Sequence, residues 1–516
     1  MLMRNENKDN PIIDLLVIGG GINGSGIARD AAGRGLKVTL CEKDDLASHT
    51  SSSSTKLIHG GLRYLENYDF LLVRHSLQER EVLLRSAPHI IWPLRFILPH
   101  HDGLRPRWML RLGLFLYDYI GGRKKLPASR SVNLVKHVAG AFLKLKFTHA
   151  FEYSDCWVQD ARLVVLNARD AAAHGASILT HTECTRLQRH NDHWRITLRD
   201  KRNGLEKTIN SRAVINASGP WVDKTLGLYE NASHKRSVRL VKGSHIVVSK
   251  LFDHPYPYIF QNPDGRIIFA IPFEHDYTLI GTTDLDFKDD PNEVKINQQE
   301  IDYLCQSVSE YTACPVTVDQ VIWSYSGIRP LFDDAKNNAS KVTRDYVLDL
   351  DTNGAPVVSV YGGKVTTYRK LSEQVVDQLK QPLDFNAPAW TGQAILPGGD
   401  IAQADFESFV TQMKNRYEWL EENVLADYCR NYGSEIDTLL GKSQSMSELG
   451  EHFGGGLYQC EVEYLIQHEW ACHVDDILWR RTKKGLRLNK EEVNHLKQWI
   501  VKYQPDKMTT NQETAS

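Results

Sequence analysis

The glycine-rich segment 19–24 is suited to hold phosphate groups against its backbone. Gly19 allows a tight turn, Gly21 lets the backbone approach a pyrophosphate, and Gly24 lets a helix pack closely on a strand. Glu42 follows 18 residues after Gly24, near the position of an acid that accepts a hydrogen bond from a ribose hydroxyl. An acid there disfavours NADP, while NAD and FAD both stay open. The expected contacts with this dinucleotide are Gly19, Gly21, Ile22, Asn23, Gly24 and Glu42.

Two strands and a helix must position this loop. Residues 12–18 are a short apolar run typical of a buried parallel strand. Residues 27–32 carry small side chains at helical spacing, glycines at 33 and 35 end the helix, and residues 36–41 predict a second strand. The helix N-terminus would present free N–H groups and its positive dipole end to the phosphates. The order of these elements predicts a Rossmann-like unit.

Three later segments extend the predicted cofactor site. The polar run 47–56 follows the second strand; its hydroxyls can donate to phosphate or flavin oxygens, although a flexible serine linker is an alternative. An apolar strand at 213–217 and another at 358–361 each run into a glycine turn, and the latter turn begins a helix. These segments favour FAD over NAD. The contacts expected from them are Ser51, Ser52, Ser54, Lys56, Gly219, Gly363 and Thr366.

Several cationic residues lie in turns beside glycine or proline, where a binding role is more probable than surface salt bridging. Arg63, Arg329 and Lys364 are of this kind, and Tyr64 follows Arg63. Arginine can hold a phosphate with two parallel donors, and lysine acts as a point charge. His59 is a candidate base because histidine accepts a proton near neutral pH. The sequence contains no evident Ser-His-Asp triad or metal-ligand spacing, so no metal is expected.

The chain resembles the FAD-dependent, aerobic-type glycerol-3-phosphate dehydrogenases. The resemblance spans residues 12–375, and several of its segments are long and contain unusual residues. The C-terminal portion fits in length and helical character, with weaker motifs. The matching segments are GGGINGSG (19–26), STKLIHGGLRY (54–64), FEYSDCWVQD (151–160), VKGSHIVV (241–248), IGTTD (280–284), YSGIRP (325–330) and GGKVTTYR (362–369).

The resemblance implies that sn-glycerol 3-phosphate is oxidised to dihydroxyacetone phosphate. The C2 hydrogen would leave as hydride to flavin N5, and the electrons would pass to membrane quinone. Either His59 takes the hydroxyl proton, or Arg329 or Lys364 stabilises the alkoxide. The expected catalytic residues are therefore His59, Arg329 and Lys364. The expected substrate-binding residues are Arg63, Tyr64, Arg329, Lys364 and Thr282, with a lesser claim for Thr283. A homodimer is also expected.

The predicted fold class is α/β plus α+β: a Rossmann-like FAD-binding domain, an antiparallel-sheet substrate cap and a C-terminal helical domain. Residues 12–90, 155–245 and 320–385 are expected to form one discontinuous FAD-binding domain. Residues 91–154 and 246–319 are expected to form the cap and membrane-facing region. Residues 245–320 alternate between apolar and polar positions, as at 267–271 and 277–280, which suits an antiparallel sheet that caps the flavin. Residues 389–516 are expected to be helical.

Composition and one basic, apolar stretch bear on location. A net charge of −2 gives no global support for nucleic-acid binding, and eight scattered cysteines favour a reduced, cytosol-facing compartment. No apolar run is long enough to span a bilayer. Residues 105–117 and 123–125 predict either an interfacial helix on anionic headgroups or a buried helix with a basic end. The resemblance favours the former, as a peripheral protein on the cytoplasmic face of the inner membrane.

Three other functions remain open from the sequence. An oxidase of the same fold would reduce oxygen instead of quinone, and the yield of peroxide would distinguish it. A flavin-binding regulatory module without turnover would not be bleached by glycerol 3-phosphate. An amine-oxidising flavoenzyme would bind a single carboxylate, for which three clustered cations are more than is needed.

Overall fold

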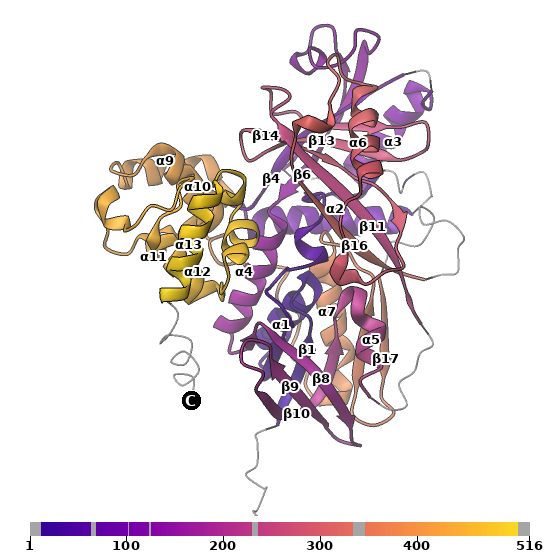
Figure 1. Cartoon of the computed structure of the whole chain (residues 1–516). Helices are drawn as coiled ribbons and strands as arrows, with labels where there is room; N and C mark the ends of the chain where they lie inside the picture. The colour runs from indigo at the N-terminus through magenta and orange to yellow at the C-terminus, as the bar shows by residue number, and fades with distance from the viewer. Residues whose placement is uncertain are drawn as a thin grey trace, which may run out of the picture.

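The computed structural model describes residues 12–62, 65, 69–101, 103–122, 125–229, 236–333 and 346–503. Two sheets and a separate group of C-terminal helices make up the molecule, with the C-terminal helices beside α4 on the left of Figure 1. Arg63 and Tyr64 lie outside the described residues, as do Arg123 and Lys124.

The first sheet contains eight strands in the order β17-β18-β10-β1-β2-β7, with β9 paired to β10 and β8 to β9. The neighbours β18, β10, β1, β2 and β7 are parallel, so their carboxyl ends meet at one edge. The bounds are β1 Ile13–Ile18, β2 Val38–Cys41, β7 Ser177–Leu179, β8 Thr182–Arg189, β9 Trp194–Asp200, β10 Glu206–Asn216, β17 Val347–Asp351 and β18 Val357–Tyr361.

Helices α1 (Ile22–Gly33), α4 (Asp160–Ala173) and α7 (Tyr368–Gln378) pack together on this sheet. Small residues bring α1 close to its neighbours: a Cβ on Gly26 would lie 2.7 Å from the Tyr368 ring. The apolar run of β1 and the small face of α1 are buried in one core. The predicted Rossmann-like unit is confirmed. The short helices α5 (Val222–Leu226) and α8 (Lys380–Leu383) follow β10 and α7.

The second sheet contains ten strands in the order β15-β11-β14-β13-β12-β4-β6-β3, with β16 paired to β11 and β5 to β6. Most of its pairs are antiparallel, as expected for a cap. The bounds are β3 Leu57–Ile58, β4 Ile91–Pro99, β5 Arg130–Asn133, β6 His149–Val158, β11 Val238–Ser249, β12 Tyr258–Gln261, β13 Ile267–Phe273, β14 Tyr277–Gly281, β15 Leu285–Asp286 and β16 Val321–Phe332. Helices α2 (Phe70–Ser86), α3 (Arg107–Ile120) and α6 (Gln298–Ser309) belong to the same region (Figure 1).

The strand β16 lies in the second sheet, whereas we expected residues 320–385 to belong to the FAD-binding domain. It runs antiparallel to β11 from Val238↔Phe332 to Val248↔Val321. The predicted boundary at residue 245 likewise falls inside β11. The two strands form a long ribbon that crosses from the cap to the first sheet. The motif at 325–330 therefore lies near the cofactor site although its strand, β16, belongs to the second sheet.

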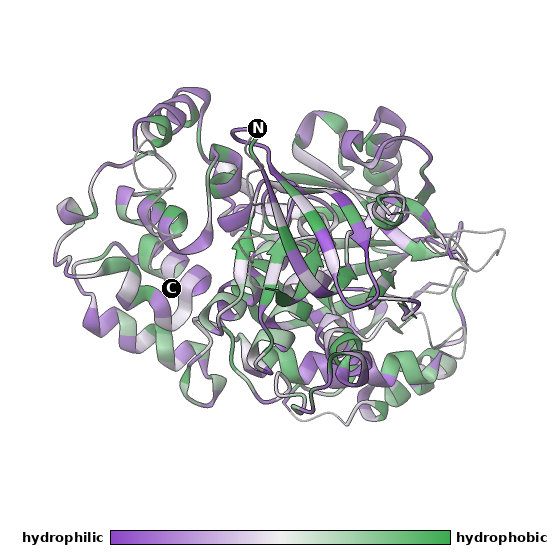
Figure 2. Cartoon of the chain, turned by 90° about the horizontal axis from the view of Figure 1, so that it is seen from below, coloured by the Kyte–Doolittle hydropathy of each residue, from purple (hydrophilic) through white to green (hydrophobic). Residues whose placement is uncertain are grey.

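The C-terminal helices form a core of their own, which confirms the expected helical domain. In Figure 2 these helices, on the left, alternate between hydrophilic and hydrophobic residues. Within the described ranges, no helix is long and apolar enough to cross a bilayer. The bounds are α9 Phe406–Arg416, α10 Glu422–Tyr432, α11 Ile436–Leu440, α12 Gln459–Glu469 and α13 Lys490–Tyr503, with a π-helical turn at Asp476–Arg481.

Candidate active site

A cavity of about 990 Å³ lies where the carboxyl ends of the parallel strands meet the second sheet. The turns that follow β1, β10 and β18 line it, and these are adjacent strands. The segment after β2 and the end of β16 complete its wall. The structure therefore brings together the three glycine turns that the sequence singled out.

The glycine loop after β1 has the geometry that its spacing predicts. Gly19 has a φ of +112°, and a Cβ on it would lie 2.6 Å from the carbonyl oxygen of Ala217. A Cβ on Gly24 would lie 1.9 Å from the Gly19 oxygen, so Gly24 serves the packing of α1 rather than the cavity wall. The first turn of α1 has no acidic residue, and its N-cap has no side-chain hydrogen bond. Its N-terminus is therefore suited to an anionic group.

Glu42 is buried at the end of β2 and lines the cavity. Its two carboxylate oxygens accept hydrogen bonds from the backbone N–H groups of Gly20 at 2.6 Å and Asp44 at 2.9 Å. Burial raises the pKa of Glu42, while these two N–H groups act to lower it. Glu42 thus fixes the glycine loop in addition to presenting acceptors to the cavity, a role that the spacing alone did not indicate.

The segment after β2 contributes some, but not all, of its predicted contacts. Ser51 and Ser54 line the cavity, and Ser51 Oγ accepts a hydrogen bond from the Ile22 N–H at 3.0 Å. Ser52 is not among the lining residues; its hydroxyl donates to the His49 carbonyl at 3.2 Å. Thr50 Oγ1 donates to the Ile328 carbonyl at 2.6 Å, which joins this segment to β16. The segment is therefore an ordered loop rather than a free linker.

Lys56 departs from the expectation of cofactor contact. Thr55 and Leu57 line the cavity, while the Lys56 side chain points away from it and lines a second cavity. Its ammonium pairs with Asp160 at 2.7 Å and donates to the Ser52 carbonyl at 3.0 Å. The left-handed backbone of Lys56, with a φ of +60°, reverses the direction that the residue would otherwise take.

Arg329 and Lys364 both line the cavity, from β16 and from the turn after β18. The Arg329 guanidinium donates to Asp284 Oδ1 at 2.5 Å and to Thr282 Oγ1 at 2.9 Å. Thr282 does not line the cavity, so it acts here by orienting Arg329. Gly363 lines the cavity beside Lys364. The Asn23 amide donates to the Gly362 carbonyl at 3.2 Å, which ties this turn to α1.

His59 lines the cavity in the loop that follows β3. The backbone N–H of His59 donates to Thr366 Oγ1 at 3.3 Å, and the Thr366 hydroxyl lies 3.4 Å from the His59 carbonyl oxygen. Thr366 therefore braces this loop and does not line the cavity. The next residue in the loop, Gly60, donates its N–H to the Tyr117 phenol oxygen at 2.8 Å. Tyr117 comes from α3 and itself donates to Asp155 at 2.8 Å. The loop is therefore held from both sides.

Sequence reasoning missed His245, which lies on β11 behind Arg329. Its Nε2 is 3.0 Å from Thr55 Oγ1, and its ring stacks on Tyr325 at 4.8 Å between centroids. Burial, and then the charges of Arg329 and Lys56, lower the pKa of His245 well below its usual value. His245 is therefore a neutral imidazole at neutral pH. The segment 241–248 was recognised as a motif, but nothing in the sequence distinguished this histidine within it.

The chain matches known families over nearly its whole length. Residues 14–369 match the family described as FAD dependent oxidoreductase, and residues 389–513 match the C-terminal domain of alpha-glycerophosphate oxidase. The D-erythritol 1-phosphate dehydrogenase of Brucella abortus is 50% identical over 488 residues, which cover 94% of this chain and 97% of that protein. The aerobic glycerol-3-phosphate dehydrogenase of Escherichia coli is 46% identical over 501 residues, covering 96% and 99%.

Among solved structures, the glycerol-3-phosphate dehydrogenase of Bacillus halodurans in complex with FAD superposes with a TM-score of 0.77. The two chains are 28% identical, and the match covers 95% of this chain and 90% of that one.

Proposed function

Because the chain belongs to the family of FAD-dependent oxidoreductases and uses FAD as its cofactor, we propose that it oxidises sn-glycerol 3-phosphate and passes the electrons to quinone. The observation that carries this proposal is that Arg329 and Lys364 line the same cavity as the glycine loop. Two cations beside a dinucleotide site suit a phosphorylated alcohol better than a neutral one.

The residues of the cavity fit FAD. The uncapped start of α1 and the close approach at Gly21 suit the pyrophosphate, and Glu42 presents acceptors for a ribose hydroxyl. The glycine turn at 362–363 approaches from the neighbouring strand β18. When bound, FAD supplies the acceptor for the hydride that leaves C2 of the substrate.

The chain's own residues orient the substrate and manage its charge. Arg329, held by Asp284 and Thr282, offers a fixed guanidinium to the phosphate or to the C2 oxygen, and Lys364 offers a second cation. His59, which lines the cavity, is the candidate to accept the hydroxyl proton, whereas His245 is fully buried and does not line the cavity. The proposed roles of Arg63 and Tyr64 stay predictions, because both lie outside the described residues.

A second candidate substrate is D-erythritol 1-phosphate, because one relative at 50% identity carries that name. Both compounds are phosphate monoesters of a polyol with a hydroxyl on the carbon next to the phosphate-bearing one. The same cations would hold either phosphate, so the choice depends on the room left for the longer carbon chain.

Anaerobic titration of the flavin with each compound tests these proposals. We expect glycerol 3-phosphate to bleach the flavin absorbance at lower concentration than D-erythritol 1-phosphate, and a quinone analogue to restore it. If D-erythritol 1-phosphate bleached the flavin at the lower concentration, it would be the preferred substrate instead of glycerol 3-phosphate. Efficient reoxidation by oxygen with peroxide, and not by quinone, would instead identify an oxidase. No bleaching by either compound would refute a polyol-phosphate dehydrogenase.

Gly243 on β11 makes room for the Arg329 guanidinium, because a Cβ there would lie 2.4 Å from its Nη2. We therefore expect Gly243→Ala to displace the guanidinium and to lower kcat/KM by about 10- to 100-fold, since small misplacements of a binding group are costly. Steady-state kinetics at unchanged flavin content measure this. Gly113→Ala is the control, because a Cβ at Gly113 meets nothing within 4 Å. Equal activity of the two variants would contradict the role of Gly243.

The proposed attachment to a membrane is supported by the surface of α3. Trp108, Leu112 and Phe115 expose 67%, 51% and 50% of their surface, so the described part of the chain does not cover this helix as it would a core helix. Arg107 begins the helix and Arg111 lies within it. An exposed apolar face with basic residues is typical of a helix that lies in the headgroup region of an anionic bilayer. The cytoplasmic face of the inner membrane stays the proposed location.

Replacing Trp108 and Leu112 together by glutamate is expected to abolish co-sedimentation with anionic liposomes, because it places charge on the inserted face. Leu205→Glu is the control, since Leu205 is equally exposed, at 69%, but lies between β9 and β10 of the first sheet. Unchanged sedimentation of the double variant would exclude α3 as the anchor. The proposed homodimer is tested in the same preparations by light scattering after gel filtration.

A further inference from the structure

A second cavity, of about 400 Å³, lies between the cap and the C-terminal domain. Its wall includes the ends of β4 and β6, the hairpin between β13 and β14, helix α10 and the segment that follows the π-helical turn. Lys56 and Asp160 form the side nearest the candidate active site. The two cavities are therefore distinct, although neighbouring residues of one segment line both.

We propose that this second cavity binds a small phosphate-bearing dianion, held by Arg430 and Lys483. The proposal does not depend on the function proposed above. It follows from two cations of the cavity wall that lack a counter-ion in the described part of the chain, whereas the other cations of the wall are paired.

Arg430, on α10, is held by aromatic rings and not by a carboxylate. Its guanidinium carbon lies 4.4 Å from the centre of the Trp92 ring and 3.7 Å from that of Phe406. Its only hydrogen bond among the described residues goes to the His89 carbonyl, at 3.4 Å. Burial lowers the pKa of Arg430 to about 10. Stacking fixes the plane of the guanidinium and leaves its donors available for an oxyanion.

Lys483 directly follows Thr482 at the end of the π-helical turn. Its ammonium donates to the backbone carbonyls of Trp479 and Thr482. No carboxylate of the described residues lies within 4.0 Å of it. Burial, and then the positive charge of Lys56, lower the pKa of Lys483 to about 7. A bound anion would favour the charged ammonium that its surroundings now disfavour.

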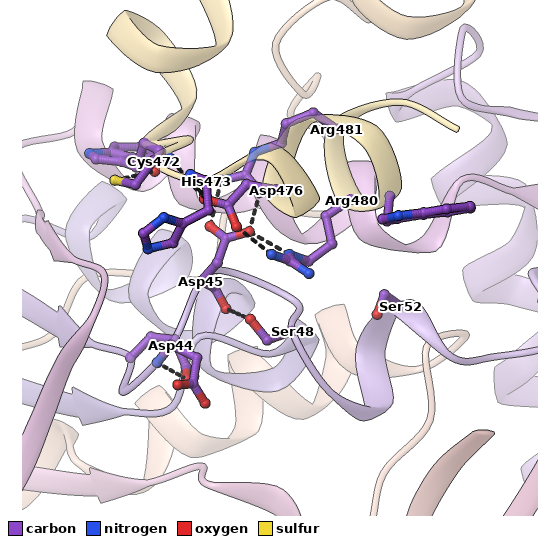
Figure 3. Close-up of polar contacts among 12 residues, drawn as sticks. Asp44, Asp45, Ser48, Ser52, Cys472, His473, Asp476, Arg480 and Arg481 are labelled. Carbon is purple, nitrogen blue, oxygen red and sulfur yellow. Dashed lines mark hydrogen bonds and ion pairs between the residues drawn. The ribbon is translucent and has the colours of Figure 1, made fainter. Parts of the chain in front are cut away.

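The remaining cations of the wall have local partners. Lys56 pairs with Asp160 at 2.7 Å, and Lys250 with Asp253 at 2.9 Å. Figure 3 shows that Arg480 and Arg481 both point to Asp45, with which they form ion pairs. These charges are already neutralised, so they add little to the field that an anion would meet.

The acids whose charges act most on Lys483 are Asp160, which is already paired with Lys56, and then Glu274. Glu274 neutralises Lys483 poorly. No ion pair within 4.0 Å joins it to a described cation. Burial raises the pKa of Glu274, and the charge of Lys483 acts against this. A carboxyl shifted toward its neutral form leaves the positive charges of Arg430 and Lys483 in excess.

Arg430 and Lys483 both line this cavity, and its volume of about 400 Å³ can hold a phosphate ester. The arginine fork can hold two oxygens of one phosphate, and the lysine a third. Trp92, Trp157 and Phe273 supply an apolar wall for the organic part of such an ester. The cavity touches both the cap and the C-terminal domain, so a ligand in it would join the two.

Inorganic phosphate is the probe, titrated into the holoenzyme by calorimetry at constant ionic strength. We expect two binding sites in the unaltered protein, one here and one at the Arg329–Lys364 cations. In the double variant Arg430→Gln/Lys483→Met we expect phosphate to bind normally at the Arg329–Lys364 cations and at least tenfold more weakly in the second cavity. The kcat/KM of this variant should be unchanged. Arg329→Met should instead remove phosphate binding at the Arg329–Lys364 cations and leave the second cavity unaffected, so the two variants distinguish the two sites.

Two further variants keep the test decisive. Lys250→Met removes a cation of the same wall that is already paired, so phosphate binding should not change. Glu274→Gln replaces a carboxyl that burial already shifts toward its neutral form, so phosphate affinity should change by less than about twofold. Two sites of unaltered affinity in the double variant, or a loss of phosphate binding in Lys250→Met, would overturn the proposal.

Discussion

Replacing Arg329 by methionine is expected to lower kcat/KM for glycerol 3-phosphate by about 10³-fold, the usual cost of losing one charged donor at a reacting centre. The substitution removes a guanidinium that lines the cavity. It also leaves the carboxylate of Asp284, now 2.5 Å from that guanidinium, uncompensated beside an anionic substrate. The rate of flavin reduction in a single turnover, measured against substrate concentration, separates a loss of binding from a loss of chemistry.

Arg239→Met is the matched control for this prediction. Arg239 lies on β11 opposite Leu331 of β16 and pairs with Asp286 at 2.6 Å, much as Arg329 pairs with Asp284. It does not line the cavity, so kcat/KM should stay within about twofold of the unaltered enzyme, in line with the small effects of partly exposed ion pairs. If Arg329→Met kept a tenth or more of the normal kcat/KM, the proposed role of Arg329 in the site would be contradicted.

Replacing Asp45 by asparagine is expected to destabilise the protein by about 3–5 kcal/mol and to release FAD, because it removes the carboxylate that neutralises the buried Arg481. Arg480, by contrast, keeps Asp476 as a partner. Asp45 is 1% exposed. Its carboxylate accepts hydrogen bonds from both terminal nitrogens of Arg481, at 2.5 and 2.7 Å, and from Arg480 Nε at 2.6 Å. Figure 3 shows both arginines reaching it from the C-terminal domain. The segment that Asp45 begins lines the cofactor cavity. Thermal unfolding and the flavin-to-protein absorbance ratio measure the two effects.

The effect of Asp45→Asn depends on pH in a defined direction. Burial acts to raise the pKa of Asp45, but Arg481 and then Arg480 lower it below its ordinary value of 3.8. A carboxyl with a lowered pKa contributes its full stability above 3.8 and loses it as the pH falls through the folded-state value. The stability difference between the two proteins should therefore be constant near neutrality and shrink below pH 3.8.

Asp437→Asn in the C-terminal domain is the control. Asp437 pairs with Arg416 at 2.7 Å, but both side chains are about half exposed, at 44% and 55%. Its loss should change the stability by less than about 1 kcal/mol and leave FAD bound. If Asp45→Asn behaved like Asp437→Asn, the C-terminal domain would have no part in holding the cofactor segment.

The sequence predicted those parts of the site that depend on local spacing. Gly19, Gly219 and Gly363 each follow an apolar strand, and parallel strands bring such turns to one edge. The direction of Lys56 was not predictable, because it depends on a left-handed backbone at a residue other than glycine. His245 was missed because its neutral state results from burial and then from the charges of Arg329 and Lys56, and all three depend on the folded structure. The sheet to which β16 belongs depends on pairing with β11, some 80 residues earlier.

Tyr117 connects the exposed helix α3 to the loop that carries His59. One phenol group, 2% exposed, accepts from the Gly60 N–H and donates to Asp155, which also accepts from Arg80 at 2.8 Å. A shift of the helix would therefore strain the hydrogen bond that holds the loop. Turnover should consequently be sensitive to the medium that surrounds α3, so that enzyme assayed in detergent micelles and enzyme assayed on lipid vesicles differ in kcat, and Tyr117→Phe brings the two rates closer together.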